Sequence, residues 1–308
     1  MISDKKAKEI IEYSVLNGND KTCEVFGINI ETLSRYKRKY KRLSYLSEIN
    51  EKYDDNDLKV IASGIKPKPF EKPIISYNGE KYRFALVGDT HFGSDCYMEY
   101  WFESVCGECS KRKIDRLFHV GDLCEGMSNR PGHIYEIMDG CLGYENQKKY
   151  AVKQLEKFNG DVYIISGNHD RWFHKSSGAE IVSDVCEQNK NWHFLGDDEG
   201  TIKINGIDIM LWHGEDGSSY AVSYRIQKIC ESFTGGEKPN VLLTGHVHKS
   251  IYLQERNIHC ISAGSLQRQT PWMRGKRLSS INGWWEVCLT IGDNQVREIT
   301  TTWRPFYV

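Results

Sequence analysis

The strongest constraint in this chain is a repeated pattern in which a strand-like apolar run stops at a carboxylate, an amide or an imidazole. The plainest case is the apolar run at residues 117–120, which is followed by Gly121 and Asp122. In an open α/β sheet, ligands bind beyond the carboxyl ends of the strands. The pattern therefore predicts one shared site, built from the residues at which the runs stop: Asp89, His91, Asp122, Asn168, His213, His246 and His248.

These seven side chains have the chemistry of a metal centre. All of them offer oxygen or imidazole nitrogen and none offers a thiolate, which suits Mn, Fe or Zn. Seven ligands exceed the needs of one ion and fit two divalent ions that share a carboxylate. Two ions roughly 3.5–4 Å apart can clamp a phosphate and lower the pKa of a bridging water. We therefore predict two divalent metal ions, with manganese preferred over iron or zinc and Asp122 as the shared ligand.

The order and register of these motifs resemble the calcineurin-like metallophosphoesterase superfamily over residues 80 to about 270. The motifs that carry the resemblance are Asp89-Thr90-His91, Gly121-Asp122, Gly167-Asn168-His169-Asp170, His213 and Gly245-His246-Val247-His248. The resemblance implies an α/β fold, in which a two-sheet β-sandwich is flanked by helices. It also implies a hydrolase in which a hydroxide that bridges two metal ions makes an in-line attack on phosphorus.

Roles for individual residues follow from the same resemblance. It implies that Asp89, His91 and His248 hold one ion. It implies that Asn168, His213 and His246 hold the other, with Asp122 between them. His169 would act at the leaving-group oxygen as a general acid or charge stabiliser, and Asp170 would orient its imidazole.

The substrate class is harder to predict than the chemistry. The sequence Gly-Asn-His-Asp at 167–170, with Asp89-x-His91-x-Gly93, is more similar to DNA-repair nucleases of the Mre11/SbcD type than to Ser/Thr protein phosphatases. No coiled-coil partner region or capping domain is recognisable after residue 270, which favours a stand-alone nuclease acting on DNA or RNA. The alternatives are a phosphomonoesterase, a small-molecule or cyclic-nucleotide phosphodiesterase, and a non-catalytic DNA-binding regulator.

An N-terminal all-α domain is predicted for residues 1–45. Helical spacing over residues 4–42 predicts three helices, with a Gly27 turn before the third. The pattern resembles a helix-turn-helix, as in phage-type phosphoesterases, and the third helix carries a basic cluster. We predict that this cluster contacts nucleic-acid phosphates through Arg35, Lys37, Arg38, Lys39, Lys41 and Arg42. The alternatives are a solvated basic face and an oligomerisation element.

The rest of the chain is predicted to be a linker at 46–73 and a phosphoesterase domain at 74–308. The domain is predicted to open with a hairpin, in which strands at 74–77 and 81–84 flank Asn78-Gly79. Helical patterns cover about 97–116 and 135–158. In loops near the predicted site, Arg130, His133 and His174 are candidate substrate contacts.

A second aromatic and basic stretch lies near residue 270. Arg268, Arg274, Lys276 and Arg277 interleave with Trp272. This arrangement suits a rim that stacks bases and contacts phosphates, and it equally suits packed tryptophans beside a solvated loop.

Charge and hydropathy exclude several classes. The net charge of −1 provides no general attraction to nucleic acid, so any attraction is local. No apolar run reaches the roughly 18 residues that a membrane span needs. The N-terminus lacks an apolar secretory region. The protein is therefore expected in the cytoplasm (the host cytoplasm if phage-encoded), without a membrane partner and with a homo-oligomer as an open option.

Overall fold

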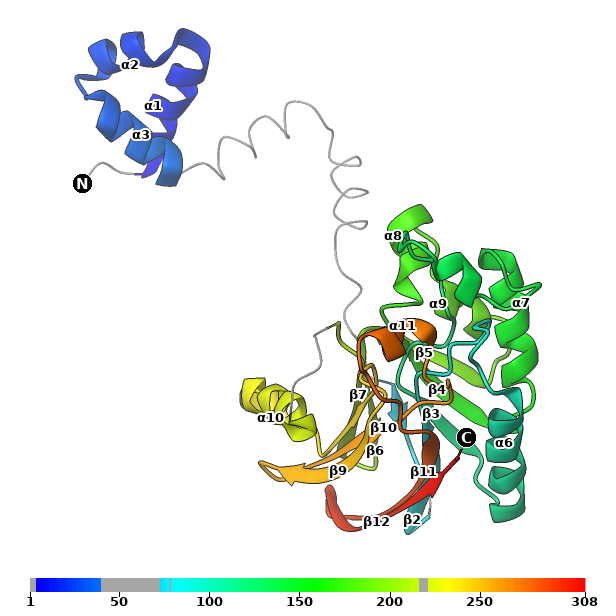
Figure 1. Cartoon of the computed structure of the whole chain (residues 1–308). Helices are drawn as coiled ribbons and strands as arrows, with labels where there is room; N and C mark the ends of the chain where they lie inside the picture. The colour runs from blue at the N-terminus through cyan, green and yellow to red at the C-terminus, as the bar shows by residue number, and fades with distance from the viewer. Residues whose placement is uncertain (1–3, 40–72, 78, 216–220, 308) are drawn as a thin grey trace. The chain divides into compact units, whose positions relative to one another are not determined.

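The computed structural model describes residues 4–39, 73–77, 79–215 and 221–307. The chain divides into two units, Met1–Glu71 and Lys72–Val308. The described part of the first unit consists of the three expected helices, α1 (Asp4–Asn17), α2 (Asn19–Phe26) and α3 (Ile30–Lys39) (Figure 1). The predicted linker from residue 46 to 72 lies outside the described residues, as do Lys41 and Arg42.

The three N-terminal helices pack around a small apolar core. Ala7, Ile10 and Ile11 of α1 are buried, and Leu33 of α3 is 1% exposed. The side chain of Asn29 accepts a hydrogen bond of 2.8 Å from the backbone N–H of Thr32, so it caps the start of α3. This packing is compatible with a helix-turn-helix, which remains a prediction.

The second unit contains two six-stranded sheets. One has the order β1-β6-β7-β8-β10-β9, and the other has the order β12-β11-β2-β3-β4-β5. The first sheet is made of β1 (Ile74–Ile75), β6 (Glu199–Ile204), β7 (Ile207–Trp212), β8 (Val241–Thr244), β9 (Ser250–Glu255) and β10 (Ile258–Ala263). The second is made of β2 (Lys81–Val87), β3 (Arg116–His119), β4 (Asp161–Ser166), β5 (Trp192–Asp197), β11 (Gly283–Gly292) and β12 (Gln295–Pro305).

The two sheets face each other across an apolar core. Phe84, Leu86 and Phe118 from the second sheet and Ile209 and Leu243 from the first are completely buried in one cluster. Burying a side chain of this size stabilises a fold by roughly 1.5–3 kcal/mol. This core joins the sheets into the expected β-sandwich.

Helices cover the outer faces of the sandwich (Figure 1). The second sheet packs against α6 (Glu99–Arg112), α7 (Tyr144–Leu155) and α9 (Ile181–Cys186). The first sheet packs against α10 (Val222–Ser232). The remaining short helices are η1 (His133–Glu136), α8 (Arg171–Ser177), η2 (Gly235–Glu237) and α11 (Pro271–Gly275). No helix in the described ranges is long and apolar enough to cross a membrane.

Two local predictions were wrong. The hairpin around Asn78-Gly79 does not form, because Ile74 and Ile75 pair in parallel with Lys203 and Ile204 of the other sheet. Strand β2 instead pairs with β11 and β3. The helix predicted over about 135–158 begins only at Tyr144, since Gly140 and Gly143 adopt positive φ angles before it.

Candidate metal centre

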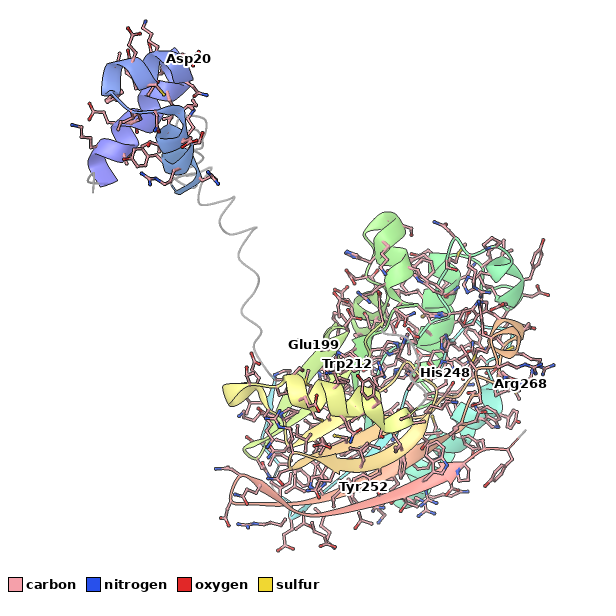
Figure 2. The ribbon with its side chains drawn as sticks, turned by 60° about the vertical axis from the view of Figure 1, so that its left-hand side comes forward. Asp20, Glu199, Trp212, His248, Tyr252 and Arg268 are labelled. Carbon is pink, nitrogen blue, oxygen red and sulfur yellow. The ribbon has the colours of Figure 1, made fainter. Side chains whose placement is uncertain are left out.

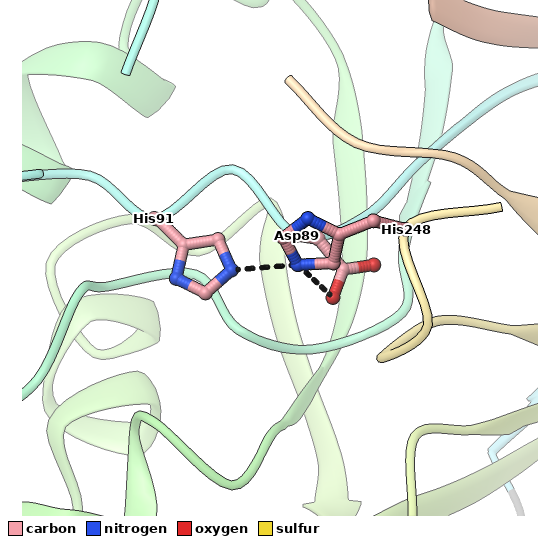
Figure 3. A group of neighbouring side chains, drawn as sticks. All are labelled: Asp89, His91 and His248. Atoms are coloured by element: carbon pink, nitrogen blue, oxygen red, sulfur yellow. Dashed lines mark hydrogen bonds and ion pairs between the residues drawn. The ribbon is translucent and has the colours of Figure 1, made fainter. Parts of the chain in front are cut away.

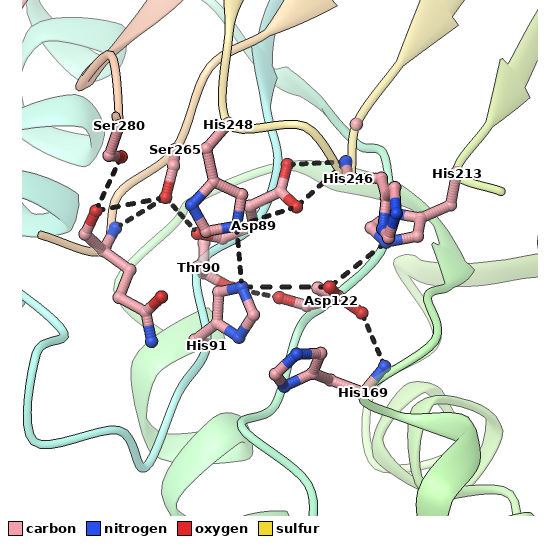
Figure 4. Close-up of polar contacts among 12 residues, drawn as sticks. Asp89, Thr90, His91, Asp122, His169, His213, His246, His248, Ser265 and Ser280 are labelled. Atoms are coloured by element: carbon pink, nitrogen blue, oxygen red, sulfur yellow. Dashed lines mark hydrogen bonds and ion pairs between the residues drawn. The ribbon is translucent and has the colours of Figure 1, made fainter. Parts of the chain in front are cut away.

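The predicted ligands meet because strands of both sheets end at the same edge of the sandwich. Strands β2, β3 and β4 are parallel and lead to Asp89 and His91, to Asp122 and to Asn168 respectively. Strands β7 and β8 are also parallel, and they lead to His213 and to His246 and His248. Figure 4 shows six of these seven side chains labelled around one point.

The backbone at this edge is strained. Five of the seven residues occupy the left-handed region, with φ of 49° at Asp89, 50° at His91, 51° at Asp122, 76° at His246 and 51° at His248. Non-glycine residues seldom adopt positive φ, and such strain collects at functional sites. The fold thus holds the backbone of these five residues in a conformation that their local preference alone would not select.

One cluster joins Asp89, His91 and His248 (Figure 3). The Nε2 atoms of His91 and His248 are 3.2 Å apart. His248 Nε2 is 3.4 Å from Asp89 Oδ1. All three side chains are at most 9% exposed, so the cluster is buried.

A second cluster lies beside the first and includes Asp122, His213 and His246. His213 Nε2 is 3.1 Å from Asp122 Oδ2 and 3.2 Å from Asn168 Oδ1. His246 Nδ1 is 2.7 Å from the same Asn168 oxygen. Asp122 Oδ2 is also 3.8 Å from His91 Nε2 of the first cluster, so Asp122 lies between the two clusters.

The geometry of both clusters fits metal ions. Ligand atoms bound at about 2.1 Å from an ion stand roughly 3.0–3.4 Å apart at octahedral or tetrahedral angles. The separations of 3.2 and 3.4 Å in the first cluster fall in this range, as do those of 3.1 and 3.2 Å around His213, while His246 Nδ1 and Asn168 Oδ1 lie closer, at 2.7 Å. The donor set is imidazole nitrogen and carboxylate or amide oxygen, which suits Mn, Fe or Zn.

Contacts behind the ligands orient them. The Nδ1–H of His213 donates to the carbonyl oxygen of Val120 at 2.6 Å, which leaves Nε2 directed at the cluster. Arg225 is 5% exposed, donates to the carbonyl of Gly245 at 2.9 Å and also donates to the carbonyl of His213. Arg225 therefore ties together the two loops that carry His213 and His246.

A buried glutamate also supports the centre. Glu125 Oε1 accepts from His133 Nε2 at 2.9 Å, and Glu125 Oε2 accepts from Gln267 at 3.0 Å. Glu125 Oε2 is also 3.1 Å from His91 Nδ1. Burial favours the neutral acid, but the hydrogen bonds from His133 and His91 outweigh it and lower the pKa of Glu125 below its usual value. Glu125 is the third residue after Asp122 and does not directly follow an apolar run. The pattern that predicted the other site residues therefore did not include it.

The buried charges shift the pKa values of the ligands. Burial lowers the pKa of His213, but Asp122 and Asp89 outweigh burial and raise it to about 9. Burial likewise opposes protonation of His91, and Glu125 raises its pKa to about 9. Burial raises the pKa of Asp89 to about 7. These histidines thus sit where positive charge is favoured, and a divalent cation can supply that charge in place of protons.

His169 lies beside this centre, and its partner differs from the expected one. Its backbone N–H donates to Asp122 Oδ1 at 2.8 Å (Figure 4). Its Nδ1 donates to the carbonyl oxygen of Glu125 at 2.8 Å. The prediction that Asp170 orients the imidazole is corrected: the Asp170 carboxylate accepts from the backbone N–H groups of Leu123, Cys124 and Gly167. Asp170 therefore ties the β3 and β4 loops together.

The three residues predicted to contact the substrate differ in whether they line the cavity at the centre. Arg130 lines the cavity at the centre and forms a bidentate ion pair with Glu136. His133 is 1% exposed and supports Glu125. His174 lies on α8, pairs with Glu180 and is not among the residues that line this cavity. Neither residue lines the cavity, and their contact with a substrate remains a prediction.

The basic residues of the N-terminal unit are only partly described. Arg35 and Arg38 are exposed on α3, and Lys37 donates to Asn19 at 2.8 Å. Lys39 ends α3. Their predicted contact with nucleic acid remains a prediction.

A cavity of about 640 Å³ opens onto the clusters. Metal-cluster residues Asp122 and His248 line it together with His169 and the aromatic residues Trp172 and Trp272. The His169 and Trp172 rings lie 3.9 Å apart between centroids. A substrate that enters the cavity therefore meets aromatic surface beside the candidate metal site.

Comparisons with known proteins agree with this geometry. The chain matches the calcineurin-like phosphoesterase superfamily domain over residues 82–277, more than half of its length. It is similar to the DNA polymerase II small subunit of Methanothermobacter thermautotrophicus, at 23% identity over 252 residues that cover 66% of this chain and 51% of that protein. The DNA polymerase II small subunit of Methanocaldococcus jannaschii is 25% identical over 247 residues, which cover 65% of this chain and 41% of that protein.

The chain therefore spans about half the length of these curated relatives, or less. Among solved structures, it is similar to an archaeal phosphodiesterase with a TM-score of 0.42 and 15% identity, over 72% of this chain and 100% of that one. The domain match covers all the residues of both clusters. This chain belongs to the calcineurin-like phosphoesterase superfamily.

Proposed function

We propose that this protein is a phosphodiesterase that needs two divalent metal ions and acts on nucleic acid. The observation that carries the proposal is the position of Asp122, whose Oδ2 atom lies 3.1 Å from His213 Nε2 and 3.8 Å from His91 Nε2. One carboxylate oxygen is thus within reach of both clusters. Asp89, His91 and His248 would hold one ion, and Asn168, His213 and His246 the other, with Asp122 shared.

The chain's own residues prepare this chemistry. Bound divalent ions supply Lewis-acid polarisation of phosphate oxygens and lower the pKa of water at neutral pH. Val120 and Glu125 fix the rings of His213 and His91 so that their Nε2 atoms face the centre. Because the strained loops hold the ligands in place, little reorganisation is needed when charge develops on the phosphate.

His169 is the residue proposed to act on the leaving group. Its Nδ1 is occupied by the carbonyl of Glu125, so Nε2 is the ring atom that remains to exchange a proton or to hydrogen-bond an oxygen. Burial lowers the pKa of His169 below its usual value, which favours the neutral ring. A phosphate that enters beside it would favour the protonated ring and so would raise this pKa.

Nucleic acid is the proposed substrate class for two reasons. The relatives that the chain matches are DNA polymerase II small subunits, and that setting suits a polynucleotide. The cavity at the centre also combines cationic Arg130, Lys249 and Lys276 with Trp172 and Trp272, a mixture that suits phosphates and bases together. The exposed arginines of α3 would add electrostatic attraction.

A small phosphodiester is the second candidate, because the cavity volume of about 640 Å³ is that of a small-molecule site. Pockets of roughly 300–1,000 Å³ are typical of small-molecule sites. A substrate of the size of one nucleotide would therefore fit. This alternative shares the metal centre and differs only in what lies beyond the scissile phosphate.

The test is an activity matrix on the full chain. Purified protein would be stripped of metal, loaded with Mn²⁺, Fe²⁺ or Zn²⁺, and incubated with labelled single- and double-stranded DNA and RNA, bis(p-nitrophenyl) phosphate and p-nitrophenyl phosphate. We expect metal-dependent cleavage of the diester substrates, lost in Asp122→Asn and reduced by at least tenfold in His169→Ala. Turnover confined to the monoester, or variants as active as the parent, would contradict the proposal.

A further inference from the structure

The segment from residue 267 to 279 separates two cavities and presents a different chemistry to each. Gln267, Trp272, Met273 and Lys276 line the cavity of about 640 Å³ at the metal centre. Arg268, Arg274 and Arg277 line a second cavity of about 910 Å³. One short stretch of chain therefore borders both the candidate catalytic site and a strongly basic hollow.

The basic cavity has a surplus of positive charge. Among the residues that the structure describes, no carboxylate lines it, and no ion pair reaches Arg268, Arg274 or Arg277. The Nε atom of Arg268 is buried and lacks a hydrogen-bond partner within the described ranges. Figure 2 shows Arg268 at the edge of the unit, beside α11. Three arginines around one hollow without carboxylates form a site for anions, and their planar guanidinium groups suit phosphate.

The segment is held rigidly, so its side chains are preorganised. Gln267 donates to Glu125 at 3.0 Å, which links the segment directly to the support of the metal centre. Gln269 donates to the carbonyl of Leu278 at 2.6 Å and closes the loop on itself. Asn282 donates to the carbonyl of Gln267 at 2.7 Å. These ties fix both faces of the segment relative to the candidate metals.

Trp272 presents an exposed aromatic surface at the metal-centre cavity. Its side chain is 43% exposed although it is large and apolar. The guanidinium carbon of Arg130 lies 5.4 Å from the centre of one Trp272 ring, and Glu136 holds that guanidinium by two hydrogen bonds of 3.1 and 2.7 Å. An exposed, fixed indole next to unpaired arginines is the combination found where single strands bind.

We propose that residues 267–279 guide one strand of nucleic acid past the metal centre. In this arrangement a base stacks on Trp272, while phosphates beyond the scissile one contact Arg268, Arg274 and Arg277 in the basic cavity. The inference rests on the proposed function and deepens it, because it assigns single-stranded nucleic acid as the ligand. A duplex would keep its bases stacked on one another, so they would be unavailable to Trp272.

The test measures binding without cleavage. The full chain would be mixed with a fluorescent single-stranded oligonucleotide of about 15 nucleotides in EDTA, and affinity would be followed by anisotropy across a range of salt concentrations. The triple variant R268Q/R274Q/R277Q should bind roughly 10–100-fold more weakly. Its plot of log K against log salt should be shallower by about 2, since each lost contact to a single strand removes about 0.7.

Matched variants separate this surface from general charge effects. K149Q/K153Q/K190Q removes three exposed lysines from elsewhere on the same unit, and it should leave affinity and salt slope unchanged. Trp272→Ala should weaken binding of the single strand roughly tenfold or more, and Trp272→Phe should restore most of it. A hairpin duplex of the same sequence should show no such dependence on Trp272.

Three results would overturn the inference. The arginine variant could bind like the lysine control, Trp272→Ala could bind like the parent, or poly-L-glutamate could displace the oligonucleotide as well as an unlabelled strand does. The last result would indicate a surface for an acidic protein. Hydrolysis plays no part in this readout, so an inactive parent would refute the proposed function while the binding result still decides the inference.

Discussion

Replacing Glu125 by glutamine tests whether the metal centre depends on the buried carboxylate behind it. Glu125 is 1% exposed and accepts from both sides: Oε1 faces His133 Nε2, and Oε2 faces Gln267 Nε2 and His91 Nδ1. His133 Nδ1 already accepts from the backbone N–H of Ser128 at 3.2 Å, so its Nε2 is a donor. A glutamine at this position keeps the volume but places an NH₂ donor against at least one donor.

The expected size of the effect follows from these contacts. Loss of a carboxylate that supports a metal-bound histidine lowers metal affinity or activity by roughly 10–100-fold, or about 1.4–2.7 kcal/mol. A buried donor left without its acceptor costs a further 1–3 kcal/mol or so of folding stability. We therefore expect Glu125→Gln to fold at a reduced Tm and to bind Mn²⁺ at least tenfold more weakly.

The assay is calorimetric titration of the metal-free full chain with Mn²⁺, together with hydrolysis of bis(p-nitrophenyl) phosphate. Circular dichroism verifies that the variant is folded. Glu99→Gln is the matched control, because Glu99 lies on α6 and pairs with Lys157 away from the clusters. If Glu125→Gln binds Mn²⁺ and turns over within twofold of the parent, the supporting role assigned to Glu125 is refuted.

Three further perturbations have defined outcomes. Gly121 has φ of 90°, and an added Cβ would lie 2.5 Å from His213 Nδ1. Gly121→Ala should therefore lower the free energy of unfolding by about 1–2 kcal/mol or more and reduce the amount of bound metal measured by mass spectrometry. Parent-like values for both quantities would refute the close approach. Chelation by EDTA should lower Tm and abolish hydrolysis, and re-addition of metal at 100 times Kd should restore about 2.7 kcal/mol of stability. A Tm that responds to neither step would contradict a metal site within the fold. Burial raises the pKa of Glu286, but hydrogen bonds from Arg304 and Arg83 outweigh burial and lower this pKa overall. The stability that the Glu286 carboxylate contributes is therefore complete above the usual glutamate pKa and is lost as the pH falls through the lowered pKa. Glu286→Gln should flatten the acid side of a plot of Tm against pH, and an unchanged acid side would count against the argument.

The proximity of the seven proposed ligands was predictable because each one follows a buried strand. Asp122 comes three residues after β3, and parallel strands β2, β3 and β4 deliver their ends to one edge, so order along the chain translated directly into proximity. The apolar runs mark the strands, and the strand ends mark the site. The β-sandwich itself is confirmed for the same reason.

Other features depended on contacts that local sequence does not encode. Asn78-Gly79 has the chemistry of a hairpin turn, but Ile74 and Ile75 gain parallel pairing with β6 in the other sheet, and this tertiary pairing overrides the turn signal. Glu125 and Asp170 are isolated acidic residues, and only the folded loops show that one supports histidines while the other holds backbone amides.

The most direct test of a shared Asp122 is a crystal structure of the full chain grown with Mn²⁺, in which anomalous scattering locates the ions. The account predicts two ions roughly 3.5–4 Å apart, with the Asp122 carboxylate bound to both. Asp89, His91 and His248 should surround one ion, and Asn168, His213 and His246 the other. A single ion, or two ions without Asp122 between them, would contradict it.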